Sequence, residues 1–282
     1  MRFSQVFQFA LSLQRIAQLA RDELAPLLSG IDWEDEGARG TVKLLMGALL
    51  EKYGTPAAEL GTEWYDLCAE DAEQGSTRIV GQLPQGVGQV GMDVALDSLF
   101  DRRDALDMEI EDALAGLMVD YVKKSARSAI LGNLAEDQEQ YELLGTRYSR
   151  RRYGNVAPGF CSVPTGDTTC AYCIMQASRG YALYSDFKQK FANDRSNMWH
   201  DDCDCVVVPY ADASSIEGYD RYEEYRDMYE GADDLYRRVQ DGTASYPPDL
   251  QERIDGLAGR TDTAKGTRER LVVMRYLYGL EH

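Results

Sequence analysis

The most informative parts of this sequence are two stretches, VPTGDTTCAYCIMQASRGY at 163–181 and WHDDCDCVVVPY at 199–210. They carry five candidate metal ligands, which are Cys170, Cys173, His200, Cys203 and Cys205. Two residues between paired thiolates let a tight turn direct both sulfurs at one point, and a second pair from elsewhere in the chain completes a tetrahedron. Thiolate and imidazole ligands suit zinc and make a poor site for magnesium or calcium. The two stretches therefore predict a structural zinc site.

A single tetrahedral zinc ion binds four ligands, so at least one of the five candidates either does not contact the metal or only hydrogen-bonds to a ligand. Cys203 and Cys205 are separated by one residue and would share a face of an extended strand. Two other interpretations stay open, namely cysteines without metal, whether reduced or disulfide-paired, and a redox Cys-x-x-Cys pair. No βαβ pattern surrounds the pair, and the crowding of the cysteines in a chain without an export signal favours metal.

The composition of the site argues against catalysis. A catalytic zinc keeps an open position beside three protein ligands, whereas a sulfur-rich set is typical of a closed site. In nucleobase deaminases a His-x-Glu motif precedes the Cys-x-x-Cys pair, but here His200 follows it. Apart from the terminal His282, His200 is the only histidine, so little material exists for a catalytic triad. We expect no enzyme, with a Cys173/His200 nucleophile pair as the alternative.

Length and charge narrow the class of protein further. The chain has 282 residues, of which 44% are hydrophobic and 28% charged, as expected of a folded globular protein. Its formal net charge of -18 repels nucleic acid and anionic membranes unless a local basic patch intervenes. No uncharged apolar run reaches the roughly 18 residues of a membrane span. We therefore expect no membrane association.

The hydrophobic pattern predicts a mainly α fold, with long helices and a small zinc-stabilised α+β module in the C-terminal half. Short β-prone runs at 160–163 and 206–208 supply the strands of that module. The expected domains are a helical domain at 1–145, the Cys/His zinc-binding module at 146–212 and a C-terminal helical segment at 213–282.

Apolar periodicity locates the individual helices. The first carries a three-four stripe from Phe3 to Leu24 and should end near Pro26, packing inside the chain or forming a seam with another copy. A second helix is expected from Thr41 to Tyr53, ended by Gly54. A third is expected to begin at Pro56, the first helical position after Thr55. The pattern at 93–131 predicts one long helix, and 269–278 predicts a closing helix. Pro247 and Pro248 indicate a linker before it.

Two smaller features have both a structural and a functional interpretation. Four tyrosines spaced along one helix face either pack in the core or dock a partner; they are Tyr219, Tyr222, Tyr225 and Tyr229. Cys68 lies among apolar neighbours and is expected to be a small buried hydrophobe. In the turn of Ser178, Arg179 and Gly180, we expect Gly180 to adopt the left-handed conformation that ends a short helix, while Arg179 is a candidate partner contact.

The stretches at 163–181 and 199–210 resemble the C-terminal signature of the Mu protein F-like minor capsid proteins of tailed phages and prophages, especially the versions found in phages of actinobacteria. That signature combines paired cysteines, a small Ser-Arg-Gly turn and a His-x-x-Cys-x-Cys ending. All three elements are present here, as Cys170 with Cys173, the turn at 178–180, and His200 with Cys203 and Cys205. The long helical region before the module resembles that family only in its general helical pattern.

The resemblance implies a phage minor capsid protein with a role in head morphogenesis. Such proteins are encoded near the portal and reside in a few copies inside the capsid, so the implied partners are the portal and major capsid proteins. The implied location is the capsid interior of the virion, after assembly in the host cytoplasm, and self-association is open.

Two alternatives remain at this point. One is a capsid-associated hydrolase or protease. The other is a zinc module that binds nucleic acid, such as the DNA inside the head, through an arginine-rich stretch interleaved with tyrosines. The arginines of that stretch are Arg147, Arg150, Arg151 and Arg152.

Overall fold

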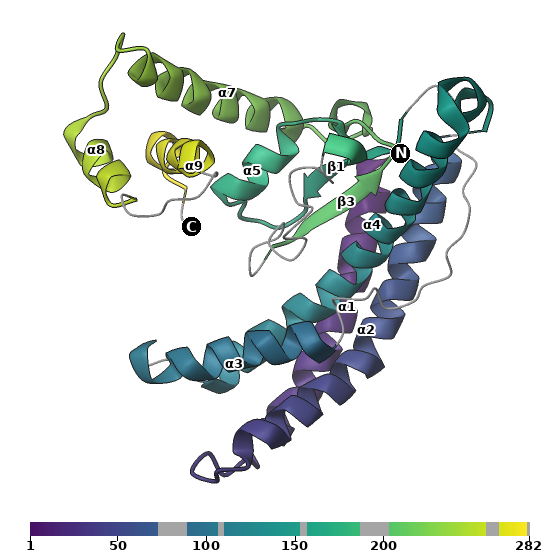
Figure 1. Cartoon of the computed structure of the whole chain (residues 1–282), viewed down its shortest axis with the longest axis vertical. Coiled ribbons are helices and arrows are strands. Elements are labelled where there is room, and N and C mark those ends of the chain that lie inside the picture. Colours follow the sequence, from purple (N-terminus) through teal and green to yellow (C-terminus); the bar gives the residue numbers. More distant parts are fainter. Residues whose placement is uncertain (73–88, 107–109, 153–156, 187–202, 258–264, 281–282) are drawn as a thin grey trace.

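A computed structural model of the chain describes residues 1–72, 89–106, 110–152, 157–186, 203–257 and 265–280 (Figure 1). Four long helices come first, α1 (Phe3–Leu28), α2 (Ala38–Asp71), α3 (Gln89–Leu106) and α4 (Ile110–Arg152). Helices α1, α2 and α4 contact one another along their length, and α3 lies across the end of this bundle far from the sheet (Figure 1). None of the described helices combines the length and the apolar character needed to cross a membrane.

A small sheet follows the bundle. It contains β1 (Gly159–Pro164), β2 (Ala182–Leu183) and β3 (Cys205–Pro209) in the order β2-β1-β3, and both pairings are antiparallel. The short helix α5 (Ala171–Ala177) packs on β1. The sequence prediction of a mainly α protein with a small α+β module is confirmed, and both β-prone runs are strands.

The C-terminal helices extend the small module on the side away from the bundle (Figure 1). A 3-10 turn, η2 (Ala213–Ser215), leads into α7 (Arg221–Gln240), α8 (Pro248–Asp255) and α9 (Lys265–Tyr278). Helices α7 and α9 contact each other and α5. The expected linker is found in part: residues 241–247 connect α7 to α8, but Pro248 is already the first residue of α8, a position where a missing N–H costs nothing.

Helix α1 shows why the bundle forms. Its buried residues recur every three or four positions and face α2 and α4; they are Val6, Phe9, Leu13, Ala17, Ala20, Leu24 and Leu28. Such a stripe gains its stability from burial against neighbouring helices. The helix passes Pro26 and ends at Leu28. The stripe predicted from the sequence packs within the chain.

The expectation of two helices around Gly54 and Pro56 is wrong, because α2 runs unbroken through both residues. Gly54 is buried inside this helix. Further along, a Cβ added at Gly61 would overlap the carbonyl oxygen of Ala126, so α2 and α4 approach each other too closely there for any side chain. Packing of this kind over many turns outweighs the local preference of glycine and proline to end a helix.

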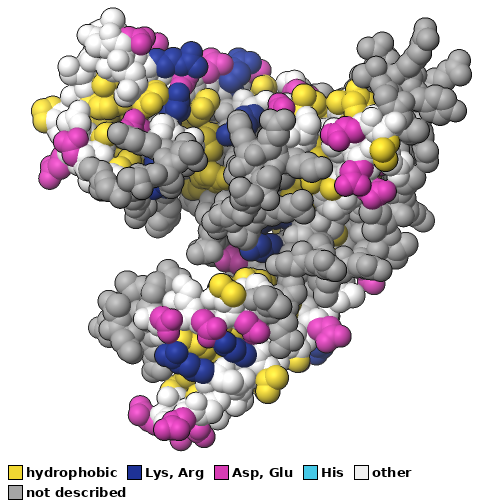
Figure 2. Space-filling model, in the orientation of Figure 1, with side chains coloured by type: hydrophobic (Ala, Val, Ile, Leu, Met, Phe, Trp, Pro, Cys, Tyr) yellow, Lys and Arg dark blue, Asp and Glu magenta, His cyan; other side chains and the backbone are white. Residues whose placement is uncertain are grey.

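The helical pattern at 93–131 belongs to two helices, α3 and α4, where we expected one long helix; residues 107–109 between them lie outside the described part of the chain. Ion pairs hold α3 against α2, between Lys43 and Asp97 at 2.6 Å and between Arg39 and Asp101 at 3.4 Å. Figure 2 shows basic and acidic side chains intermingled on the lower part of the molecule, where α3 and α2 lie. Such exposed pairs contribute little stability each.

The sheet is attached to the bundle by buried polar contacts. Asp137 of α4 is 1% exposed and accepts hydrogen bonds from the hydroxyl groups of Tyr65 in α2 and Tyr210 after β3. Tyr210 has a left-handed backbone, with φ of 58°, which is uncommon for a tyrosine. The bonds to Asp137 help fix this conformation at the end of β3.

Candidate metal centre

Three sulfur atoms meet in a buried cluster. The Sγ atoms of Cys173, Cys203 and Cys205 all lie within 4.8 Å of one another. These residues are at most 5% exposed. Zinc–sulfur bonds of about 2.3 Å would place tetrahedral sulfurs roughly 3.8 Å apart. The Cys173 and Cys203 sulfurs are 3.6 Å apart, so their spacing already suits a shared metal ion.

Cys170 lies beside this cluster and packs against it. Its side chain caps the first turn of α5, where the Cys170 sulfur accepts a hydrogen bond of 3.4 Å from the backbone N–H of Cys173. Four of the five candidates named from the sequence therefore converge, from two segments about thirty residues apart in the chain. The fifth, His200, lies outside the described residues.

The local structure explains why the cysteines face inward. Cys170 and Cys173 are the cap and the third residue of α5, so one helical turn directs both toward the same side. Cys205 begins β3 and pairs with Pro164 at the end of β1. Cys203 and Cys205 are buried, while Asp204 between them is exposed, as expected for alternating residues of an extended segment.

The electrostatics of the cluster favour one negative charge shared among several sulfurs. Hydrogen bonds from Cys173 and Cys205, with the nearby charge of Arg127, lower the pKa of Cys203 well below its ordinary value. Hydrogen bonds with Cys170 and the other sulfurs raise the pKa of Cys173 well above its ordinary value. The bond with Cys173 lowers the pKa of Cys205, but Cys203 and burial outweigh it and raise that pKa. A divalent ion would take the place of the protons on these thiols.

Two cations of α4 hold the Cys203–Asp204–Cys205 run from outside, and the sequence analysis missed both. The Arg127 guanidinium donates hydrogen bonds to the carbonyl oxygens of Cys203 and of Cys205, the second at 3.3 Å. One turn earlier, Lys123 forms a 2.6 Å ion pair with Asp204. The available signal was two basic residues four apart on a helix face that is otherwise apolar.

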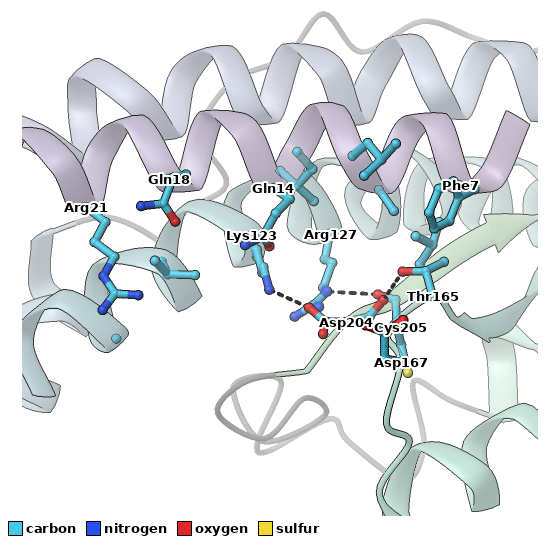
Figure 3. Close-up of a pocket in the computed structure, with 17 residues that line it drawn as sticks. Phe7, Gln14, Gln18, Arg21, Lys123, Arg127, Thr165, Asp167, Asp204 and Cys205 are labelled. Carbon is cyan, nitrogen blue, oxygen red and sulfur yellow. Dashed lines mark hydrogen bonds and ion pairs between the residues drawn. The ribbon is translucent and has the colours of Figure 1, made fainter. Parts of the chain in front are cut away.

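These cations line a cavity of about 490 Å³ between α1, α4 and the sheet module (Figure 3). Gln14, Gln18 and Arg21 of α1 lie along one wall, opposite Asp204 (Figure 3). Thr165, in the loop after β1, donates a 2.7 Å hydrogen bond to the Asp204 carbonyl oxygen on the inner side of the cavity. The cysteine run is thus supported both by α4 and by the loop after β1.

The structure also shows where the glycine, arginine and remaining cysteine candidates from the sequence lie. Gly180 is left-handed, with φ of 61°, as predicted. Arg179 is exposed and donates a 2.9 Å hydrogen bond to Gln176. Cys68 is buried among apolar residues, as predicted. Four more arginines belong to the last turns of α4, but their side chains lie outside the described part of the structure; they are Arg147, Arg150, Arg151 and Arg152.

The tyrosines after β3 join the module to α7. Tyr219 and Tyr225 are buried, and Tyr222 and Tyr229 are half-buried against the core. The hydroxyl group of Tyr225 lies 2.9 Å from the Thr169 hydroxyl, one residue before Cys170. For these residues the core-packing interpretation is confirmed.

The donor set fits a metal ion. Three sulfur atoms are gathered and buried, and the spacing of the Cys173 and Cys203 sulfurs suits two ligands of one tetrahedral ion. A metal ion can displace the protons of such thiols. The buried cysteine group could therefore hold a metal ion that fixes α5 to the start of β3.

Comparison with known proteins places the chain in a family. Neither a curated protein nor a solved structure matched the chain. A protein-family model described as VG15 protein matches residues 3–232, which include α1 to α4, the sheet, the cysteine cluster and the first part of α7. The chain therefore belongs to the VG15 protein family, a family of viral proteins.

Proposed function

We propose that this protein is a minor capsid protein of a phage, with an assembly role in head morphogenesis at the portal or the inner capsid. Its membership of a viral family supports a phage origin. The resemblance to Mu protein F-like proteins rests on motifs at 163–181 and 199–210, and the described cysteines of these motifs form one cluster. The proposed partners are the portal and major capsid proteins, and the proposed location is the capsid interior.

In this proposal the metal is zinc and its role is structural. The observation that carries this role is the burial of the sulfurs between two chain segments: Cys203 is 1% exposed and Cys205 is 4% exposed. A catalytic zinc needs a position that substrate or water can reach, whereas a buried sulfur-rich centre closes a fold. Small zinc modules gain much of their folding free energy from the metal. The module would thus present a rigid surface to its capsid partners.

Co-expression tests the assembly role. The full chain would be produced with the portal and major capsid proteins encoded beside it, and procapsids would be isolated by sedimentation. We expect the chain to sediment with procapsids, and a Cys173→Ser variant to do so less because its module is not metal-ordered. A zinc-loaded, folded chain that stays at the top of the gradient would contradict the capsid role.

Nucleic-acid binding is a second candidate function. It is supported by the four arginines that the sequence concentrates in the last turns of α4, which are Arg147, Arg150, Arg151 and Arg152. Binding through such a patch weakens steeply as salt rises. A gel-shift assay with double-stranded DNA at low salt tests it, and unretarded DNA at micromolar protein would exclude it.

A further inference from the structure

The cysteine centre has a buried cation next to it that belongs to another element. Arg127 lies on α4 and is only 6% exposed. It donates hydrogen bonds to the carbonyl oxygens of Cys203 and Cys205, two of the clustered cysteines. A buried guanidinium is costly unless charge or hydrogen bonds compensate it. The cysteine segment therefore stabilises Arg127, and Arg127 in turn fixes the backbone that directs the sulfurs.

If the proposed zinc centre is present, Arg127 also compensates its negative charge. A divalent ion with four thiolates carries a net charge of about -2, or about -1 if one ligand is an imidazole. Burying such an anion without a counter-charge is unfavourable. The guanidinium of Arg127 supplies a positive charge beside this centre, because it contacts the backbone of both Cys203 and Cys205.

Lys123 completes the arrangement one helical turn earlier. It is 7% exposed, and its ammonium group lies 2.6 Å from a carboxylate oxygen of Asp204. This pair neutralises the acid that lies between two of the cysteines, so that the Arg127 charge remains to act on the sulfurs (Figure 3). Gly166 packs so closely on Asp204 that an added Cβ would lie 2.8 Å from its other carboxylate oxygen. The acid is therefore held on two sides.

We propose that Arg127 and Lys123 are positioning residues of the metal centre, which make binding of a divalent metal and docking of the cysteine module on α4 one coupled event. With metal bound, the negative centre draws the guanidinium of Arg127 to the cysteine run. Without metal, this attraction is weaker, and the contact between α4 and β3 loosens. Metal occupancy would then set how rigidly the module sits on the long helices.

The test compares zinc affinity in the full chain by chelator competition. Outer partners of metal ligands typically change metal affinity by about 10- to 100-fold, so we expect Arg127→Gln to weaken zinc binding by about that factor. Arg127→Lys keeps the charge and should recover part of the loss. The matched control is Arg270→Gln, which removes a half-buried arginine that pairs with Asp233 between α9 and α7, and it should leave zinc affinity unchanged.

Hydrogen exchange provides the second readout. In the wild type, chelation of zinc should increase exchange in α4 around 123–134 as well as in β3, and in Arg127→Gln this zinc-dependent difference in α4 should shrink. If Arg127→Gln does not fold, Lys123→Gln serves instead, with a smaller loss of affinity expected. Wild-type zinc affinity in the α4 variants, or an equal loss in the Arg270 control, would overturn the coupling. A wild type that binds no metal would overturn the zinc centre itself.

Discussion

The indole N–H of Trp64 donates a 2.9 Å hydrogen bond to the backbone carbonyl oxygen of Val207, which joins α2 to the middle of β3. β3 is an edge strand of the sheet, so this indole satisfies a carbonyl group that no neighbouring strand covers. Phe9 of α1 stacks on the same indole, with ring centroids 4.9 Å apart. One side chain therefore links both N-terminal helices to the strand that begins at Cys205.

This contact predicts a large effect of Trp64→Phe. The substitution keeps an aromatic ring but leaves a buried carbonyl group without its donor, which costs about 1–3 kcal/mol in the free energy of unfolding. Urea unfolding followed by circular dichroism measures the loss. The control is Trp33→Phe, because the indole of the half-buried Trp33 donates a longer hydrogen bond of 3.5 Å, and its acceptor is the exposed side chain of Glu111. Equal losses in the two variants would argue against the importance of the Val207 bond.

Removal of one clustered sulfur should abolish stoichiometric metal binding. Cys173 lies in contact with the other sulfurs, so Cys173→Ser removes a ligand from the middle of the cluster. Elemental analysis should find one zinc ion per wild-type chain and none in this variant. The matched control is Cys68→Ser, which changes a buried cysteine of α2 outside the cluster and should retain the metal. Loss of zinc in both variants would mean that general unfolding releases the metal.

The identity of the fourth ligand is a separate prediction. Cys170 packs on the three gathered sulfurs, so we expect it to complete the centre and His200 to lie outside it. Cobalt substituted for zinc reports its thiolate ligands through the charge-transfer absorption. Cys170→Ser should lower this absorption, whereas His200→Ala should leave it unchanged. The reverse pattern would assign the fourth position to His200.

The gathering of the cysteines could be predicted from the sequence because short motifs determine short-range geometry. A Cys-x-x-Cys pair at the start of a helix and a Cys-x-Cys pair at the start of a strand each direct two side chains to one side, whatever surrounds them. Glycine at the end of α5 was predictable for the same reason, since Gly180 needs a left-handed backbone. Local chemistry was sufficient for these features.

Other features depend on distant partners and could not be predicted from local pattern. Gly54 and Pro56 signal a helix end, but α2 continues because its other turns pack on α1 and α4. The role of Arg127 depends on its meeting a strand that begins 78 residues later, which no spacing rule reveals. Tyr65, Asp137 and Tyr210 likewise come together only in the folded chain.

The buried contact of Tyr65 with Asp137 predicts a pH-dependent stability. Burial, with the charges of Tyr210 and Asp137, raises the pKa of Tyr65 far above the value of about 10 expected in the unfolded chain. The stabilisation from a raised pKa is fully present below about pH 10 and is lost as the pH rises above it. Tyr65→Phe should therefore cost about 1–3 kcal/mol near pH 7, through the lost hydrogen bond to a buried carboxyl group, and less near pH 11.

Urea unfolding of the wild type and the variant at the two pH values measures this gap, which is the difference between their free energies of unfolding. Tyr141→Phe, at a half-buried position on α4, should show little gap at either pH. A gap for Tyr65→Phe that stayed constant up to pH 11 would show that the hydroxyl group of Tyr65 does not carry this alkaline dependence.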